Sequence, residues 1–598
     1  MAVGFDFGTT NSLISVIVGD RAIDVTDEDD LPFPSVVRYE GQRVTVGRAA
    51  KESLDTAGLG IHGNAVRSPK FLLGEESVHI GGVERSPVDI VHDVVSYVRR
   101  EALSSVHADR LDGVRSAVVT IPITMDGPRR RALRDAFARS EIGIVQFVHE
   151  PLAALYGYIR GHAERDSILR ALSNRNVLVV DWGGGTLDLT LCRIEESRIV
   201  QIRNGGTSEI GGDRFDEAIR DEVIGRFCAA NGLPAGVEIH PDARLQLLHD
   251  SEEIKKALSE RESATFYRPD FFRNPRTTLE YKLTRNEMEE IVRPMVSAGI
   301  KEIEALLDSV NIGPAQISTC LVVGGMAAMP VIRGRLHEIF GPQRVEIPPN
   351  SATMVSQGAA WIAHDSQPLV LSKPIELQLA RGSFLTLVAA GAEMPSEGET
   401  RRQQINLFCS DPTDGIAKVS LYTPQRVTAQ PQASEPRAAL GHLTVRVDPA
   451  ARPFTERLEL DAVIDDDLIL QVTATSADVG DEAHAWFHNL EFGLHLPGGA
   501  KKGGGDPAPQ TPKGPGREPG ALSIRANVTK TADQALVPGD VLYRFNRLAF
   551  DKRNTRPDRA TDAQIHEYLY YTPCAVCGRR SSDKACRCVS GPSRPAAQ

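Results

Sequence analysis

Two glycine-containing turns of the same pattern, far apart in the chain, constrain this sequence more than any other feature. The first is Asp6-Phe-Gly-Thr-Thr-Asn11 and the second is Asp181-Trp-Gly-Gly-Gly-Thr-Leu-Asp188; each follows a short apolar run. Glycine lets backbone N–H groups approach an anion closely, threonine hydroxyls add donors, and an acidic side chain can hold hydrated Mg²⁺. The repeat therefore predicts a pair of phosphate loops.

A third turn supports the same interpretation. Gly211, Gly212 and Asp213 stand at the start of a predicted helix, whose N-terminal amides can also bind an anion. A single glycine-rich turn is more often an ordinary turn, but three together favour a nucleotide site. The predicted phosphate contacts in the first two turns are Gly8, Thr9, Thr10, Asn11, Gly183, Gly184, Gly185 and Thr186.

The sequence pattern of residues 1–366 is typical of an α/β domain. Val114–Ile121, Val177–Asp181 and Cys320–Gly324 are short runs rich in Val, Ile or Leu that indicate buried strands. Longer stretches of helical periodicity separate them, including Pro128–Phe137 and Asp213–Phe227. We therefore expect helices that flank sheets, with a ligand at the strand ends.

The pattern changes after Gln367. Residues 367–373 form a short apolar linker, and residues 374–497 contain runs that alternate apolar and polar side chains, as in a β-sandwich. From Gly498 to Gly520, thirteen of 23 residues are Gly or Pro, a composition that predicts a disordered tether. Residues 521–598 form a small C-terminal region.

Four cysteines gather in that last region. Cys574, Cys577, Cys586 and Cys588 could supply four thiolates to Zn²⁺, although the tight second pair is less usual and free thiols in a frayed tail are the alternative. The other four cysteines are scattered singly, as in a reducing compartment.

The net charge and the distribution of apolar residues limit which partners and which cellular location the sequence predicts. The net charge of −11 opposes nucleic acid as a main partner, because phosphate-backbone binding requires clustered cations. Asp6 interrupts the start of the chain where a secretory signal would be apolar, and no run of about 18 apolar residues follows. The sequence thus predicts a cytoplasmic protein without a membrane span.

The chain resembles the heat-shock protein 70 (DnaK-type) chaperone family over roughly residues 1–497. The resemblance rests on GFDFGTTNS, VVDWGGGTLDLT and IGGDRFD at the three turns, and on AVVTIP, VHEPLAALYGY and LVVGGMAAMP between and after them. It implies an actin-like (ribonuclease H-like), two-lobed ATPase domain followed by an all-β sandwich that binds unfolded polypeptides. The cofactors implied are ATP or ADP with Mg²⁺.

The resemblance also assigns catalytic roles. Lys70 matches the family's catalytic lysine and Glu150 the carboxylate that positions water, while Thr186 lies near the γ-phosphate. Asp6 and Asp181 match residues that hold Mg²⁺ through water, and Asp181 also counts as catalytic. Without the motifs, a lone lysine or glutamate would be read as a surface charge and either aspartate as a turn cap.

At the adenosine end the resemblance is incomplete. Helical spacing puts Glu252, Lys255, Lys256 and Ser259 on one face, which in the family contacts adenosine but could equally be a solvated face. Gly324 and Gly325 match the turn that approaches the nucleotide. The family's polar residue and arginine are replaced after these glycines by Met326-Ala327-Ala328, and its Pro-Asp pair by Ser351-Ala352. We therefore expect weaker or less adenine-selective nucleotide binding.

In the family, a proline and an arginine eight residues later relay the state of the nucleotide to the client-binding domain, and Pro122 and Arg130 have this spacing. Alternatively, Pro122 simply ends a strand and Arg130 lies on a helix surface. The Gly/Pro tether begins where the family's helical lid should follow. The leading hypothesis is a chaperone that works with a J-domain co-chaperone and a nucleotide exchange factor. Two alternatives remain open: an actin-like small-molecule kinase, and a nucleotide-binding regulatory or scaffold protein with weak ATPase activity.

Overall fold

The chain folds into two compact units. The computed structural model describes residues 2–53, 60–195, 197–234, 236–379, 383–427, 435–497 and 542–543. Of these, the first unit comprises residues 2–369 and 493–497, and residues 370–492 belong to the second unit. The predicted tether at 498–520 and nearly all of the region at 521–598, with its four cysteines, lie outside the described residues.

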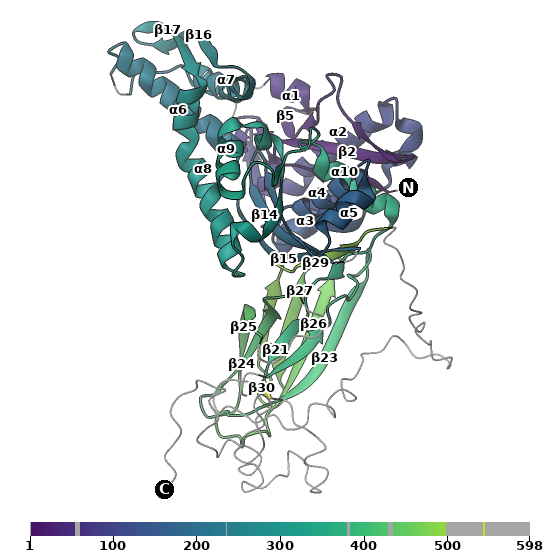
Figure 1. The fold of residues 1–598 in the computed structure, drawn as a ribbon. Coiled ribbons are helices and arrows are strands. Elements are labelled where there is room, and N and C mark those ends of the chain that lie inside the picture. The colour runs from purple at the N-terminus through teal and green to yellow at the C-terminus, as the bar shows by residue number, and fades with distance from the viewer. Residues whose placement is uncertain are drawn as a thin grey trace. The chain divides into compact units, whose positions relative to one another are not determined.

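The first unit contains two large sheets built on one plan (Figure 1). In the first sheet, β1 (Val3–Phe7) pairs antiparallel with β2 (Asn11–Val18) and parallel with β11 (Ser116–Ile121). In the second, β13 (Asn176–Trp182) pairs antiparallel with β14 (Leu187–Glu195) and parallel with β18 (Ile317–Val323). The two predicted phosphate loops are therefore equivalent hairpin turns, one in each sheet.

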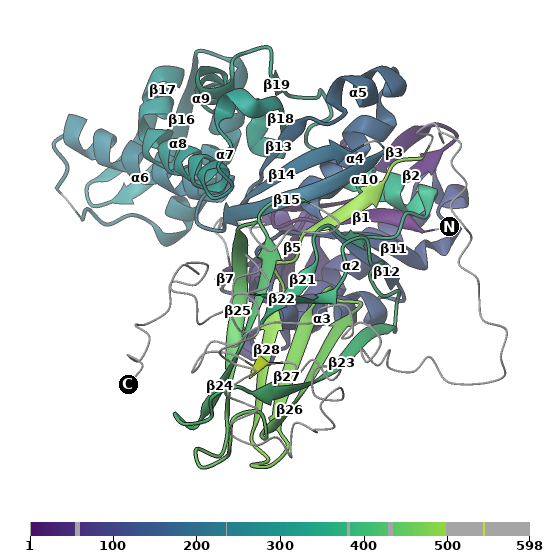
Figure 2. The same ribbon diagram turned by 60° about the horizontal axis from the view of Figure 1, so that its bottom comes forward.

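Further strands extend these sheets on both sides. The first sheet runs in the order β12-β11-β1-β2-β3, with β12 at Gly143–His149 and β3 at Arg21–Val25; β4 (Phe33–Pro34) pairs with β2. The second runs β19-β18-β13-β14-β15, with β19 at Val345–Glu346 and β15 at Arg198–Thr207. Figure 2 shows β13, β14 and β15 side by side. The outer edge of β15 pairs with β29 (Phe492–His495).

Two helices pack closely against each other beside the first sheet. They are α4 (Glu150–Gly161) and α10 (Met354–Asp365), and α10 also contacts β1 and β2. A Cβ atom on Gly358 would lie 1.8 Å from the carbonyl oxygen of Ala153, so only glycine permits this approach. Strand β1 is almost wholly apolar because α10 covers one of its faces.

The other helices of the first unit lie around the sheets. Helix α2 (Pro87–Ser104) begins at Ser86, whose hydroxyl accepts from the Val88 amide, and its buried residues recur at helical spacing. The remaining helices are α1 (Arg48–Ser53), α3 (Gly127–Arg139), α5 (Arg165–Leu172), α6 (Gly212–Ala230), α7 (Pro241–Glu260), α8 (Arg285–Asp308) and α9 (Pro330–Phe340). Short 3₁₀ turns are η1 (Pro69–Leu72), η2 (Ala108–Arg110), η3 (Asp112–Val114), η4 (Pro314–Gln316) and η5 (Gly325–Ala328).

Three small sheets complete the first unit. One has the order β6-β5-β8-β7, and the others are the hairpins β9–β10 and β16–β17. Their bounds are β5 (Val36–Glu40), β6 (Arg43–Val46), β7 (Gly60–His62), β8 (Ala65–Arg67), β9 (Val78–Ile80), β10 (Val83–Arg85), β16 (Ser263–Arg273) and β17 (Arg276–Thr284).

The second unit consists of antiparallel strands, in agreement with the predicted all-β character. Its sheets have the orders β22-β21-β24-β25 and β28-β27-β26-β23-β30. Buried and exposed side chains alternate along β26 and β27, because one face of each strand points inward. The bounds are β20 (Val370–Leu371), β21 (Ile375–Gln378), β22 (Phe384–Val388), β23 (Thr400–Cys409), β24 (Ile416–Pro424), β25 (Arg437–Arg446), β26 (Arg457–Asp465), β27 (Leu470–Ser476), β28 (Glu482–Phe487) and β30 (Leu542–Tyr543).

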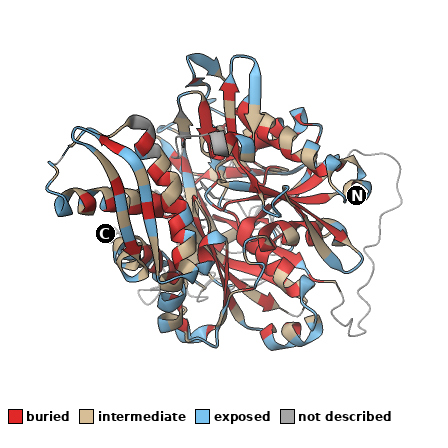
Figure 3. Cartoon of the chain, turned by 90° about the horizontal axis from the view of Figure 1, so that it is seen from above, coloured by how far each residue is buried: buried red, intermediate tan, exposed pale blue. Residues whose placement is uncertain are grey.

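Burial follows the strands and the inward faces of the helices (Figure 3). Residues 493–497, which the sequence pattern assigned to the β-sandwich, instead belong to the first unit, because their backbone pairs with β15. Among the described residues, no helix has both the length and the apolar character needed to cross a bilayer.

Candidate active site

A cleft in the first unit collects most of the predicted nucleotide contacts. The space between its walls amounts to about 990 Å³, which includes volume open to solvent. Its predicted lining residues are Asp6, Gly8, Thr9, Thr10, Asn11, Glu150, Asp181, Gly183, Gly184, Gly185, Thr186, Gly212, Asp213, Glu252, Lys255, Lys256, Gly324 and Gly325. Asp216, Met326, Ala352 and Val355 complete the lining.

The two phosphate loops face each other across this cleft. A Cβ atom on Gly184 would lie 2.1 Å from the Thr10 hydroxyl oxygen, so the loops are in contact and a larger residue at 184 would push them apart. The third turn lies against the second loop: the Gly212 amide donates to the Gly183 carbonyl (3.1 Å) and the Asp213 amide to the Gly184 carbonyl (2.8 Å). Gly211 is the N-cap of α6, so all three predicted turns meet at one place.

Buried carboxylates lie around a buried lysine beside the cleft; Asp6, Glu150 and Asp181 line the cleft, whereas the predicted catalytic Lys70 does not. The Lys70 ammonium, carried on η1, lies 2.9 Å from Oε1 of Glu150 at the start of α4. Asp6 accepts from the Thr120 hydroxyl at 2.7 Å, and Asp188 accepts from the Ile123 amide at 2.9 Å. Lys70 is only 5% exposed, which excludes the reading of a solvated surface lysine.

These carboxyl groups hold their protons more tightly than usual. Burial and the charge of Glu150 raise the pKa of Asp6 to about 6, despite Lys70. The same two causes raise the pKa of Asp188 to about 7, and they raise that of Asp181 well above its usual value. Carboxylates that disfavour one another's charge are suited to a divalent cation, and their oxygen atoms are the donors that Mg²⁺ prefers. The residues present therefore fit Mg²⁺.

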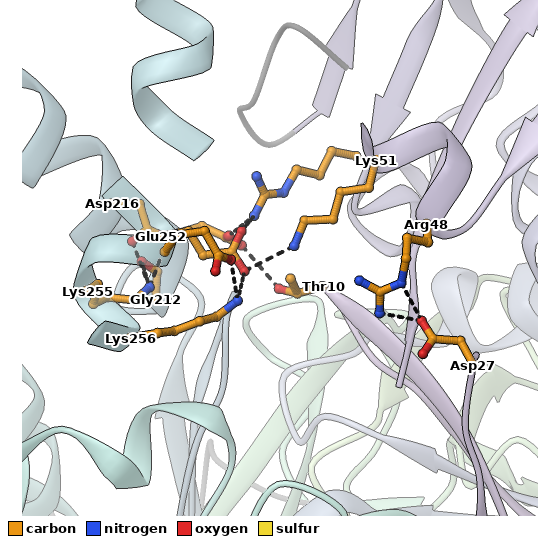
Figure 4. A network of polar contacts seen from close by, with 12 residues as sticks. Thr10, Asp27, Arg48, Lys51, Gly212, Asp216, Glu252, Lys255 and Lys256 are labelled. Atoms are coloured by element: carbon orange, nitrogen blue, oxygen red, sulfur yellow. Dashed lines mark hydrogen bonds and ion pairs between the residues drawn. The ribbon is translucent and has the colours of Figure 1, made fainter. Parts of the chain in front are cut away.

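A second polar network crosses the cleft (Figure 4). Glu252 on α7 accepts from Arg67 of β8 at 3.2 Å, from Lys51 of α1 at 3.2 Å and from Lys256 at 2.9 Å. These three cations outweigh burial and hold the pKa of Glu252 below its usual range. Arg67 also donates to Asp213 at 3.1 Å. The walls of the cleft thus cannot separate without breaking ion pairs.

Of the residues predicted to form the adenosine face, Glu252, Lys255 and Lys256 line the cleft, but Ser259 does not. Lys255 donates to Asp216 at 2.9 Å and to the Gly212 carbonyl at 3.1 Å, while Ser259 donates to the Lys255 carbonyl of its own helix. Ser259 therefore does not join the cleft lining. Gly324, at φ +84°, brings the turn close to Trp182, where a Cβ atom would lie 2.5 Å from the Trp182 carbonyl oxygen.

Sequence reasoning missed several residues of this site. Asp216, whose pKa burial raises to about 7, stands three residues after Asp213, so helical spacing could have indicated it. Asp188 belongs to the second motif, but the sequence pattern alone assigned it no function. Arg67 and Lys51 come from a different part of the chain and carry no local signal.

The two switch candidates, Pro122 and Arg130, are both buried. Arg130 on α3 is fully buried, with its Nε donating to the Met125 carbonyl at 2.9 Å, so the alternative of a helix surface is wrong. Pro122 follows directly after β11 and is buried. Burial and the charge of Arg130 lower the pKa of His149 to about 3, and His149 immediately precedes Glu150.

Comparisons with known proteins point to one family. The sequence model of a family described as Hsp70 protein matches residues 2–80 and 72–490. A chaperone protein HscA homolog from Azotobacter vinelandii is 30% identical over 389 residues, which cover 60% of this chain and 57% of that protein. The chaperone protein DnaK of Mycoplasma mycoides is 29% identical over 365 residues, which cover 60% of this chain and 58% of that protein. The chain thus matches less than two thirds of the length of these relatives.

Proposed function

The chain belongs to the Hsp70 family, and from this premise we propose that it is an ATP-dependent chaperone that couples ATP hydrolysis to the binding and release of unfolded polypeptides. Family membership implies an actin-like ATPase fold with a β-sandwich. The single observation that carries the proposal is the buried Lys70–Glu150 pair, 2.9 Å apart, behind two phosphate loops in contact.

Hydrolysis requires a cation near the transferred phosphoryl group and a carboxylate near the attacking water. Lys70 supplies the cation, and Glu150 orients the water because its own position is fixed by Lys70. The amides of the loops around Gly8 and Gly184 would bind phosphate oxygens, and Thr186, which also lines the cleft, would contact the γ-phosphate. Asp6 and Asp181 would hold Mg²⁺ through its water shell, and this ion would neutralise phosphate charge.

The base end of the cleft supports nucleotide binding with little selectivity. Met326, Ala352 and Val355 line it, and aliphatic and thioether groups pack on a purine face without reading its edge. Lys256 and Glu252, which could contact the ribose, are engaged with each other at 2.9 Å. We therefore infer that both ATP and GTP bind.

The second unit is the proposed client-binding region. Antiparallel sheets can hold extended peptides through backbone hydrogen bonds, which makes recognition broad in sequence. The position at which a helical lid would follow lies outside the described residues, so fast client exchange stays a prediction from the Gly/Pro tether. A J-domain co-chaperone and a nucleotide exchange factor are the expected partners.

Turnover measurements test the proposal. The full chain should hydrolyse ATP slowly, and both an unfolded peptide and a bacterial J-domain protein should stimulate it. Turnover that depends on a sugar would support the small-molecule kinase, and tight nucleotide binding without stimulation would support the scaffold.

A comparison of two lysine variants makes the test specific to the catalytic role. Lys70→Ala should lower kcat by about 10²- to 10³-fold while ATP binding changes little, because the cation acts on the charge of the transition state. Lys301→Ala, on the exposed side of α8, is the matched control and should behave like the parent. Equal kcat for the two variants would refute the assigned role.

A further inference from the structure

One buried serine outside the cleft holds the first phosphate loop. Ser35 follows directly after β4 and is fully buried, and it is not among the residues that line the cleft. Its amide donates to the Thr10 carbonyl at 2.9 Å, and its hydroxyl donates to the Gly8 carbonyl at 3.0 Å. Ser35 therefore holds the loop at two points.

The hydroxyl of Ser35 is itself held in place. Its oxygen lies 2.9 Å from the hydroxyl oxygen of Ser12 on β2, which is also fully buried. A hydroxyl carries one proton, and the proton of Ser35 is directed to Gly8, so Ser12 is the donor to Ser35. The two hydrogen bonds form a chain that ends on the loop carbonyl, and the bonds of such a chain strengthen each other.

These contacts determine where the amides of the loop point. A trans peptide group is planar, and its C=O and N–H bonds point in opposite directions. The Gly8 carbonyl shares a peptide group with the Thr9 amide. The Thr10 carbonyl shares one with the Asn11 amide. Because both carbonyls point toward Ser35, both amides point away from it, in a loop that lines the cleft and can donate to a phosphate oxygen.

The carbonyls of the second phosphate loop are also held, but by backbone amides. Gly183 stands in the position of Gly8, and its carbonyl accepts from the Gly212 amide at 3.1 Å. The next carbonyl, that of Gly184, accepts from the Asp213 amide at 2.8 Å. The first loop thus differs from the second because one of its two bonds comes from a side chain that a substitution can remove.

Ser35 also contacts the turn that carries Lys70. Its carbonyl accepts from the Ser68 amide at 3.0 Å. Ser68 is fully buried and is the N-cap of η1, and its φ of +61° is a conformation that residues other than glycine rarely adopt. Such a conformation persists only where the surrounding structure holds it. Ser35 therefore connects the first phosphate loop to the turn that places the Lys70 ammonium.

We propose that Ser35 is a positioning residue that orients the amides of the first phosphate loop and fixes this loop relative to Lys70. The inference rests on the proposed function, because it assumes that the loop binds a nucleotide phosphate. Without the Ser35 hydroxyl, the Gly8 carbonyl loses its partner, and its peptide group can turn so that the Thr9 amide leaves the orientation that phosphate requires. Ligands with a phosphate group depend on this loop, whereas a nucleoside does not.

Nucleotide affinity tests the orientation of the loop. In the full chain with Mg²⁺, Ser35→Ala should weaken ADP binding about tenfold in isothermal titration and leave adenosine binding within about twofold of the parent. Ser15→Ala is the matched control, because Ser15 is equally buried on β2 and its hydroxyl bonds with Asp24 (2.6 Å) and Ser356 (2.8 Å) instead of the loop. This control should leave both affinities unchanged. An equal loss of ADP and adenosine affinity in Ser35→Ala would mean a general loosening and overturn the proposal.

Hydrogen exchange tests the same contacts without a nucleotide. In ligand-free Ser35→Ala, the amides of residues 35 and 68 should exchange about tenfold faster than in the parent, whereas in Ser15→Ala they should exchange at the parent's rate. Unchanged exchange of either amide in Ser35→Ala would overturn the proposal. If both variants behave as expected but the parent hydrolyses no ATP, the proposed function fails and this inference stands. If Ser35→Ala fails to fold, Ser35→Cys replaces it, because a thiol occupies the same position but donates only weakly.

Discussion

The Lys51–Glu252 ion pair should control how fast nucleotide leaves the cleft. Lys51 lies on α1 and Glu252 on α7, so the pair bridges the two walls, and both side chains are largely buried, at 19% and 8% exposure. Opening the cleft must separate these charges. Lys51→Ala removes this bridge and leaves Arg67 to hold Glu252 across the cleft.

The magnitude follows from the geometry. Two unit charges about 4 Å apart attract by about 4 kcal/mol at an effective dielectric constant of 20. Burial lowers the pKa of Lys51, which shows that desolvation offsets part of this attraction. A net contribution of about 1–2 kcal/mol corresponds to nucleotide release that is about 5- to 30-fold faster in Lys51→Ala.

Stopped-flow release of a fluorescent ADP analogue measures this rate directly. Arg48→Ala is the matched control, because Arg48 lies on the same helix but pairs with Asp27 and Asp29 of its own wall (Figure 4). Its release rate should stay within about twofold of the parent. In a Glu252→Gln background, Lys51→Ala should have little further effect. Equal acceleration by Lys51→Ala and Arg48→Ala would refute the bridging role.

Three further predictions concern other parts of the molecule. Isothermal titration should give ATP and GTP affinities within about tenfold of each other, and a strict preference for ATP would contradict the role of Met326. Burial lowers the pKa of His149 in the folded chain to about 3, whereas in the unfolded chain it is about 6.5. Between pH 6.5 and pH 3 the unfolded chain therefore binds a proton at this group that the folded chain does not bind. The free energy of unfolding should thus decrease as the pH falls through this range. His149→Asn should flatten that slope in urea unfolding at pH 7 and pH 5, and an unchanged slope would count against it. Metal analysis of the full chain should find one zinc that Cys574→Ser removes, and a metal-free parent would favour free thiols.

The phosphate loops could be predicted because their chemistry is local. A turn that follows a strand and carries glycine, threonine and aspartate offers amides, hydroxyls and a carboxylate wherever it occurs, so Gly8, Gly184 and Asp181 were found from sequence and lie in one cleft. The change to strands with alternating apolar and polar residues after Gln367 could also be predicted, because successive side chains of a strand point to opposite faces wherever the strand lies. Lys70 and Glu150 were found only because their motifs resemble a family.

Tertiary structure alone decided which distant residues meet. Nothing near Arg67 in the sequence indicates Asp213 or Glu252, and the basic run around Arg130 resembles a solvated helix face although Arg130 is fully buried. Residues 493–497 look like any other strand of the β-sandwich in sequence, but their backbone pairs with β15 of the first unit. Such contacts depend on how sheets and helices pack, and a pattern within one segment carries no information about the surface against which that segment will pack.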